Sequence, residues 1–82
     1  MKTFTLKIAN PEKVFFEGEV QSLSSKSAVG PFDVLPEHAH FVALLHNTTI
    51  TVRLAEGADQ DFQIFRGLIE VQNNMAKVFV DL

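Results

Sequence analysis

Three histidines are the side chains of this 82-residue chain with the most versatile chemistry. His38 and His40 are separated by one residue, so on a strand both would face the same side and could begin a metal site, with His46 as a third ligand. Against such a site, the chain has no cysteine, and Asp33 and Glu37 stand at no spacing typical of a ligand set. A small metal-dependent enzyme is one alternative. Structural or interfacial histidines are the interpretation that we prefer.

Carboxylates, serines and glycines form no catalytic pattern. Glu17 and Glu19, like Asp59 and Asp61, fall in polar turns or on the outward side of a strand, where solvated charge is expected. No serine stands in a Gly-x-Ser-x-Gly context, and the four glycines are too scattered for a phosphate-binding loop. We therefore expect no catalytic residue, metal ligand or bound cofactor. The sequence favours an interaction module over an enzyme.

Bulk composition excludes several classes of protein. The formal charge of −3 and the lack of a Lys or Arg cluster argue against nucleic acid, whose binding depends on neutralising phosphates. No apolar run approaches the roughly 20 residues of a membrane helix, and the first five residues lack the apolar core of a signal peptide. The length of 82 residues suits one domain, 1–82. Eight Phe, with no Tyr or Trp, predict an interior filled without hydrogen-bonding aromatics.

The elements that must carry these residues are short strands. Apolar residues alternate with polar ones over 4–8, 50–54 and 76–80, the period of a half-buried strand. Turn signals separate the apolar runs, at Asn10-Pro11-Glu12-Lys13, Gly30-Pro31, His46-Asn47, Glu56-Gly57-Ala58-Asp59 and Asn73-Asn74. Many short strands with regular turns indicate an all-β sandwich or barrel.

Four places yield more specific predictions. Asn73-Asn74 predicts a two-residue type I′ hairpin, because Asn tolerates the positive φ that both positions need. The spacing of three between Val20 and Leu23 predicts a bulge or a change of face. Gly67 interrupts an apolar run, which indicates either a bend within the domain or a close contact with a partner. Residues 37–45 predict a turn of helix that leads into a strand.

Three blocks of the sequence resemble one family. GPFDVLPEHA, at 30–39, is similar to the "G-x-F-x-[VI]-L-P-x-H-A" signature of the epsilon subunit of F-type ATP synthases. VFFEGEV, at 14–20, resembles the "VFEGEV" strand of that family. RGLIEVQNN, at 66–74, resembles its "G-G-x-L-E-V-x-x-N" hairpin. The blocks agree in order and spacing over nearly the whole chain.

The resemblance implies a fold and a function. The amino-terminal domain of that family is a flattened β-sandwich of about ten short, mostly antiparallel strands. It would be a non-catalytic central-stalk subunit that binds the gamma subunit and the c-subunit ring and couples ion-driven rotation to ATP synthesis. It would be peripheral, at the cytoplasmic face of the inner (plasma) membrane. A small β-sandwich adaptor of another complex is the alternative from a different class.

The resemblance also implies two contact surfaces. The expected c-ring contacts are Gly30, Pro31, Phe32 and Asp33, and the expected gamma contacts are His38, Ala39, His40, Phe41 and Val42. Phe32 could equally be a core residue that shapes its loop, and His38 could equally be a packed structural residue. Both alternatives remain open at this point.

The chain departs from the family pattern in places. Asp33 and Glu37 stand where many members carry glycine, His40 where proline is common, and Arg66 where the first glycine of a Gly-Gly pair is usual. Many members continue into a two-helix carboxyl-terminal hairpin that can inhibit ATP hydrolysis, whereas this sequence stops at Leu82. We therefore expect neither that inhibition nor nucleotide binding.

Overall fold

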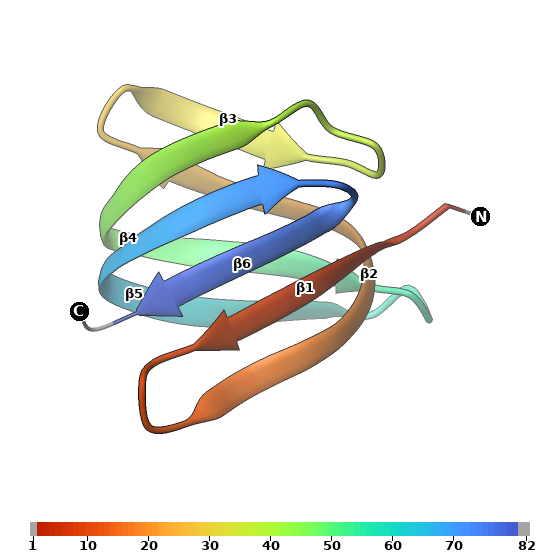
Figure 1. Cartoon of the computed structure of the whole chain (residues 1–82), viewed down its shortest axis with the longest axis horizontal. Helices are drawn as coiled ribbons and strands as arrows, with labels where there is room; N and C mark the ends of the chain where they lie inside the picture. The colour runs from red at the N-terminus through yellow and green to blue at the C-terminus, as the bar shows by residue number, and fades with distance from the viewer. Residues whose placement is uncertain (1, 81–82) are drawn as a thin grey trace.

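The computed structural model describes residues 2–80, which form six strands (Figure 1). They are β1 (Phe4–Ala9), β2 (Val14–Ser27), β3 (Gly30–Val34), β4 (Phe41–Leu54), β5 (Asp59–Gln72) and β6 (Met75–Val80). The all-β prediction is confirmed, but the expected count of about ten short strands is wrong. Three strands, β2, β4 and β5, are fourteen residues long.

The strands close into a barrel-like sandwich. Their order is β1-β6-β5-β4-β2-β3, and an additional pairing of β1 with β2 closes the first five into a ring. All neighbouring pairs are antiparallel except β1 and β6. β3 pairs only with β2 and lies outside the ring as an edge strand, at the top of Figure 1.

The long strands bend where the sequence suggested breaks. In β5 the buried positions change from a spacing of two to a spacing of three between Ile64 and Gly67, so Phe65 and Arg66 are both exposed. β4 makes the matching bend opposite, at Asn47, whose φ is 50°. In Figure 1 both strands curve round the left-hand side of the molecule. A strand that bends in this way can form part of both sheets of a sandwich. One long bent strand then takes the place of two short ones.

His46-Asn47 is therefore not a turn between strands, and that prediction is wrong. β4 continues through it, paired with β5 on both sides of the bend. A left-handed Asn changes the strand direction without ending the ladder, because Asn tolerates positive φ at little cost.

Gly67 marks a close approach within the domain. A Cβ at this position would lie 2.6 Å from the backbone oxygen of Phe79, on β6. Of the two alternatives, contact with the chain's own backbone accounts for the glycine. β6 can pair with β5 here only because residue 67 has no side chain.

Two local predictions are confirmed. The β2–β4 register shifts between Val20 and Ser22, and the Gln21 amide at this bulge donates to the carbonyls of Leu54 and Ala55. Asn73 and Asn74 have φ of 54° and 59° and join Gln72 to Met75. These are the features of a type I′ hairpin.

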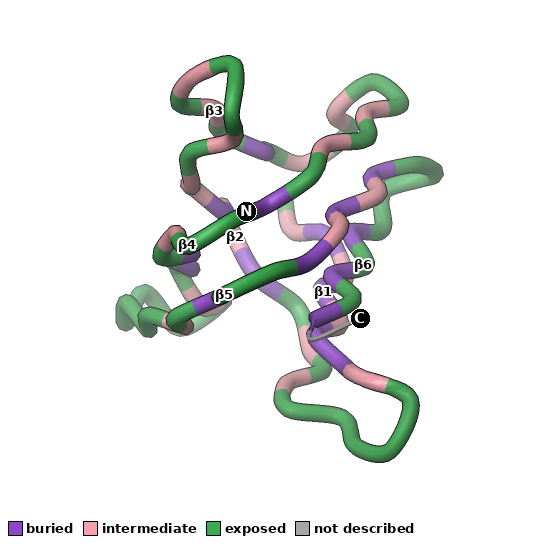
Figure 2. Tube along the Cα trace, turned by 90° about the vertical axis from the view of Figure 1, so that its left-hand side faces the viewer, coloured by how far each residue is buried: buried purple, intermediate pink, exposed green. Residues whose placement is uncertain are grey.

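The interior is aliphatic rather than aromatic. Along the strands, buried residues alternate with exposed ones (Figure 2). Among residues 2–80 no polar residue is buried, but Phe supplies little of the core, so the expectation that Phe fills the interior is wrong. Its members are mostly Val, Leu and Ile, and Phe4 is the one fully buried Phe of that range. Four others, Phe16, Phe32, Phe41 and Phe62, pack round the edge of the core.

Candidate interaction surfaces

The residues predicted to contact the c-ring lie on the edge strand β3. Ser27 pairs with Gly30, so residues 28 and 29 form the tip of a tight hairpin, and Gly30 has the φ of 130° that favours glycine. Pro31 is exposed, which an edge strand allows because no neighbour needs its missing amide proton. Asp33 is exposed and accepts a 2.7 Å hydrogen bond from the Ser24 hydroxyl.

Phe32 points away from that exposed edge and joins an aromatic cluster. Its ring is half-buried, with its centroid 5.0 Å from the centroid of Phe41. The His38 ring packs edge-on against Phe41 at 5.8 Å. This cluster supports the packing alternative for both Phe32 and His38. It also ties the two predicted contact surfaces together through side chains, because β3 and β4 are not paired as strands.

The turn before the predicted gamma contacts is not helical. His38 N donates to the carbonyl of Leu35, and Glu37, the residue after Pro36, has a φ of 64°. A proline at the second position of a turn and a positive φ at the third position are typical of a type II turn. The predicted helical turn is therefore wrong, although the strand that follows it is confirmed. The third position of such a turn favours glycine, and here Glu37 takes the left-handed backbone conformation instead.

Contacts from elsewhere in the chain hold this turn. Glu37 N donates to the Asn74 side-chain oxygen at 2.8 Å, and Asn74 Nδ2 donates to the Thr3 carbonyl at 3.0 Å. Lys2 Nζ lies 2.9 Å from Glu37 Oε2, and this contact raises the pKa of Lys2. The β5–β6 hairpin thus positions the backbone that leads to His38.

The predicted gamma contacts divide by exposure. Ala39, His40 and Val42 are exposed, whereas His38 and Phe41 are half-buried in the aromatic cluster. His40 Nε2 lies 3.9 Å from Glu70 Oε2 on the neighbouring strand. Backbone pairing sets Val42 opposite the same glutamate. The exposed members therefore lie beside the outward face of β4 and β5.

An apolar row on that outward face was missed by sequence reasoning. Leu44 pairs with Leu68, and Leu68 pairs with Phe79, so three large apolar side chains cross β4, β5 and β6 in register. Leu44 is 72% exposed and Phe79 is 37% exposed. The signal was present in the run 41–45, which is apolar on both faces of its strand. A strand of that kind is usually covered on both sides.

A second missed residue is Val29. It lies at the tip of the β2–β3 hairpin and is 98% exposed. A fully exposed valine beside Gly30 and Pro31 extends the predicted c-ring surface by an apolar tip. Nothing in the alternation pattern marks it, because it stands between strands.

The titratable groups of residues 2–80 are spread over the fold. His38 packs against Phe41, whereas His46 lies at the bend of β4, and no three His, Cys, Asp or Glu side chains among residues 2–80 are grouped to hold a metal ion. Hydrogen bonds from the Thr5 and Thr3 hydroxyls hold the pKa of Glu19 below its ordinary value. That contact is cross-strand, since Thr5 pairs with Glu19. In the part of the chain that the structure describes, no helix is long and apolar enough to cross a membrane.

Solved structures share this fold. The structure superposes on a chain of the Euglena gracilis mitochondrial ATP synthase (OSCP/F1/c-ring assembly) with a TM-score of 0.88 and 16% identity, over 95% of this chain and 50% of that one. It superposes on a chain of the Tetrahymena thermophila mitochondrial ATP synthase (central stalk/c-ring) with a TM-score of 0.81 and 13% identity, over 96% of this chain and 63% of that one.

Several sequence relatives are named ATP synthase epsilon chain. The chain is 39% identical to that protein of Chlorobaculum tepidum over 92% of its own length and 85% of the relative. It is 32% identical to that of Clostridium novyi over 98% of its own length, and there it spans 61% of the relative. The family described as "ATP synthase, Delta/Epsilon chain, beta-sandwich domain" matches residues 3–82. On this match and these relatives, the chain belongs to the ATP synthase delta/epsilon chain beta-sandwich domain family.

Proposed function

We propose that this chain acts in the central stalk of an F-type ATP synthase as a non-catalytic subunit that couples ion-driven rotation to ATP synthesis. The support is family membership, relatives named ATP synthase epsilon chain, and a shared fold with chains of central-stalk and c-ring assemblies. In this role it is a peripheral part of a membrane-associated complex, at the cytoplasmic face of the membrane.

The observation that carries the proposal is the apolar row of Leu44, Leu68 and Phe79. These three side chains, together with the exposed Val42, form a continuous patch on the outward face of three strands. Contiguous apolar patches on a protein surface mark sites of protein association. We assign this face to the gamma subunit, together with the exposed Ala39 and His40 beside it.

The β2–β3 hairpin is our candidate for the c-ring contact. Its tip combines exposed Val29 and Pro31 with the carboxylate of Asp33, which Ser24 orients. An edge hairpin of this kind can meet a polar loop without disturbing the core, because β3 pairs with β2 alone. Phe32 lies behind this surface, where its ring packs against the ring of Phe41.

Two charge substitutions test the two assignments and serve as controls for each other. We expect Leu44→Asp to weaken binding of the folded chain to purified gamma subunit by at least about tenfold, because the charge falls within an apolar contact. Val29→Asp should leave gamma binding unchanged and weaken binding to isolated c-ring. Calorimetry measures the affinities, and circular dichroism checks folding. Failure of the folded wild-type chain to bind gamma would overturn the proposal.

A further inference from the structure

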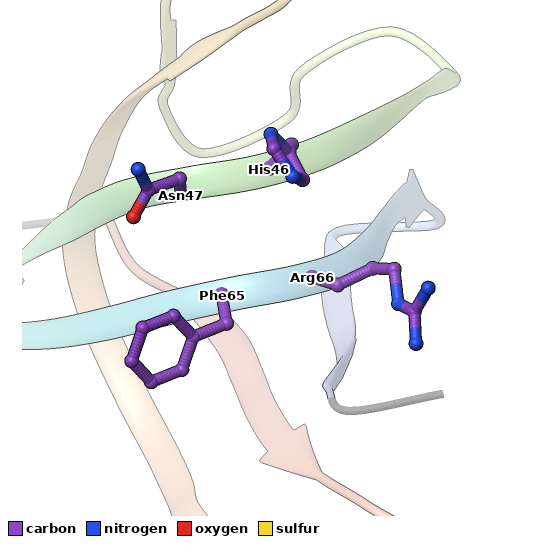
Figure 3. A pocket seen from close by; sticks show the side chains of 4 residues that line it. All are labelled: His46, Asn47, Phe65 and Arg66. Atoms are coloured by element: carbon purple, nitrogen blue, oxygen red, sulfur yellow. The ribbon is translucent and has the colours of Figure 1, made fainter.

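The bend shared by β4 and β5 presents four side chains on one corner of the molecule. His46 and Asn47 of β4 and Phe65 and Arg66 of β5 line an open, shallow pocket there (Figure 3). They share this corner because both strands turn two successive residues outward at the same level. His46 and Arg66 are directly opposite each other in the ladder, and Phe65 is 70% exposed.

The charge of this corner is opposite to that of the chain. The net formal charge is −3, yet here a guanidinium stands beside an imidazole. The ion pairs among residues 2–80 are Lys2–Glu37, His40–Glu70 and Arg53–Asp59, so no acidic group in that range neutralises Arg66. The Arg66 guanidinium and the His46 imidazole face each other across the ladder, so both can donate to one external carboxylate.

The corner is continuous with the apolar row. His46 follows Leu44 by two residues on β4, and Arg66 precedes Leu68 by two residues on β5, so all four face outward on adjoining rungs. A partner that covers the apolar row therefore reaches the corner as well. Arg is among the side chains that most often dominate the binding energy of protein interfaces, and Phe is enriched in them.

We propose that His46, Phe65 and Arg66 form an anchor for a carboxylate of the protein that covers the apolar row, with Phe65 packed beside it. The guanidinium fork matches a carboxylate in two parallel hydrogen bonds, which a lysine could not reproduce. The partner surface must then present an acidic side chain next to an apolar recess. This inference rests on the proposed function for the identity of the partner, the gamma subunit.

Association kinetics with purified gamma subunit test the anchor. We expect Arg66→Glu to lower the association rate constant about tenfold at low salt, and the difference from wild type to shrink at high salt, because exposed charges are screened. His46→Gln should lower it by a smaller factor. Lys26→Glu is the matched control, since it reverses an exposed charge near the β2–β3 hairpin and should have no effect on gamma binding.

A second variant tests whether Arg66 acts by forming an ion pair within the chain instead. Asp81 follows Val80, which pairs with Gly67, and lies outside the described residues. The effect of Arg66→Glu should therefore persist in an Asp81→Asn chain. The anchor is overturned if Arg66→Glu associates as fast as Lys26→Glu, or if its effect disappears with Asp81→Asn. In those cases a loss of binding by Leu44→Asp would still support the proposed function, whereas no wild-type binding to gamma would remove both.

Discussion

Leu44 and Leu45 are neighbours on β4, yet one is 72% exposed and the other 1%. Leu45 lies inside the barrel with Ile50 and Ile69, and Leu44 begins the apolar row that crosses to Leu68 and Phe79 on the outside. The two faces of one ladder are similarly apolar but differ in what covers them. The inner face is covered by the chain itself, so it determines stability, whereas residues 2–80 leave the outer face exposed, and we propose that it binds the gamma subunit.

The two faces should therefore respond to substitution in separable ways. Removing buried apolar area costs free energy of unfolding at roughly 25 cal/mol per Å², with an added cost for any cavity. Removing exposed apolar area costs almost nothing until a partner covers it. The following substitutions test this separation, from the largest expected effect to the smallest.

Replacing Gly67 with alanine should produce the largest loss of stability. The new Cβ would meet the backbone oxygen of Phe79 at 2.6 Å, and a backbone atom cannot move aside as a flexible side chain can. We expect Gly67→Ala to lower the free energy of unfolding by about 3–5 kcal/mol, in the range of severe core defects. Chemical denaturation followed by circular dichroism measures it.

Gly18→Ala is the matched control for that substitution. Its added Cβ would lie 3.6 Å from the Phe16 ring, an ordinary contact. We expect a change below about 1 kcal/mol, as for most substitutions that create no clash. Equal losses for the two variants would contradict the close-approach explanation of Gly67.

The pair Leu45→Ala and Leu44→Ala tests the comparison directly. We expect Leu45→Ala to cost about 3 kcal/mol of unfolding free energy, because it leaves a cavity in the core. Leu44→Ala should change stability by less than about 0.5 kcal/mol, as is usual for exposed positions. The same two variants should show the reverse order in affinity for gamma once folding is complete. A stability loss for Leu44→Ala that matches that of Leu45→Ala would end the distinction between the faces.

Substitutions in the β5–β6 hairpin, which supports the predicted gamma surface, should lower the free energy of unfolding by an intermediate amount. Asn73 and Asn74 both have positive φ, but only Asn74 holds the Glu37 amide and the Thr3 carbonyl. We expect Asn74→Ala to cost about 2 kcal/mol and Asn73→Ala about 1, the difference being the hydrogen bonds. Amide hydrogen exchange at Glu37 should accelerate in the Asn74 variant alone. Equal acceleration in both would show that the turn, rather than the side chain, holds this segment.

The smallest effect concerns pH. The folded pKa of Glu19 is lowered, first by the Thr5 hydroxyl and then by that of Thr3. A lowered pKa contributes stability that is present above the unfolded value of about 4.3 and is lost as pH falls through the folded value. Glu19→Gln should therefore flatten the decline in stability below about pH 4.3 while leaving gamma binding unchanged. Denaturation series at several pH values measure the slope, and identical slopes in the two proteins would count against it.

Local chemistry made part of the fold predictable. The Asn73-Asn74 hairpin, the bulge between Val20 and Ser22 and the period-two strands all depend on residues close together in sequence. The strand count was wrong because a bend and a break look alike in sequence. Asn47 and Gly67 each interrupt an apolar run, and only the cross-strand pairing of the surrounding residues keeps the strands continuous.

The candidate surfaces were predictable to a lesser degree. The motif at 30–42 indicated where contacts are expected, and the structure exposes Pro31, Asp33, Ala39, His40 and Val42 while turning Phe32 and His38 inward. Leu68 and Phe79 come from other strands, and their alignment with Leu44 is a matter of register. Register is set by cross-strand pairing over the whole sheet, which no local window contains.

The sequence alone determined the all-β class, the apolar character of the core and the position of the Asn73-Asn74 turn, because period, polarity and Asn backbone preferences are local properties. The tertiary structure alone decided which apolar residues remain outside. Leu44, Phe65 and Phe79 have the same chemistry as buried residues, and the closing of β1 on β2 and the paired bend of β4 and β5 leave them on the surface. Burial is a property of the packed ring of strands, whereas alternation is a property of each strand.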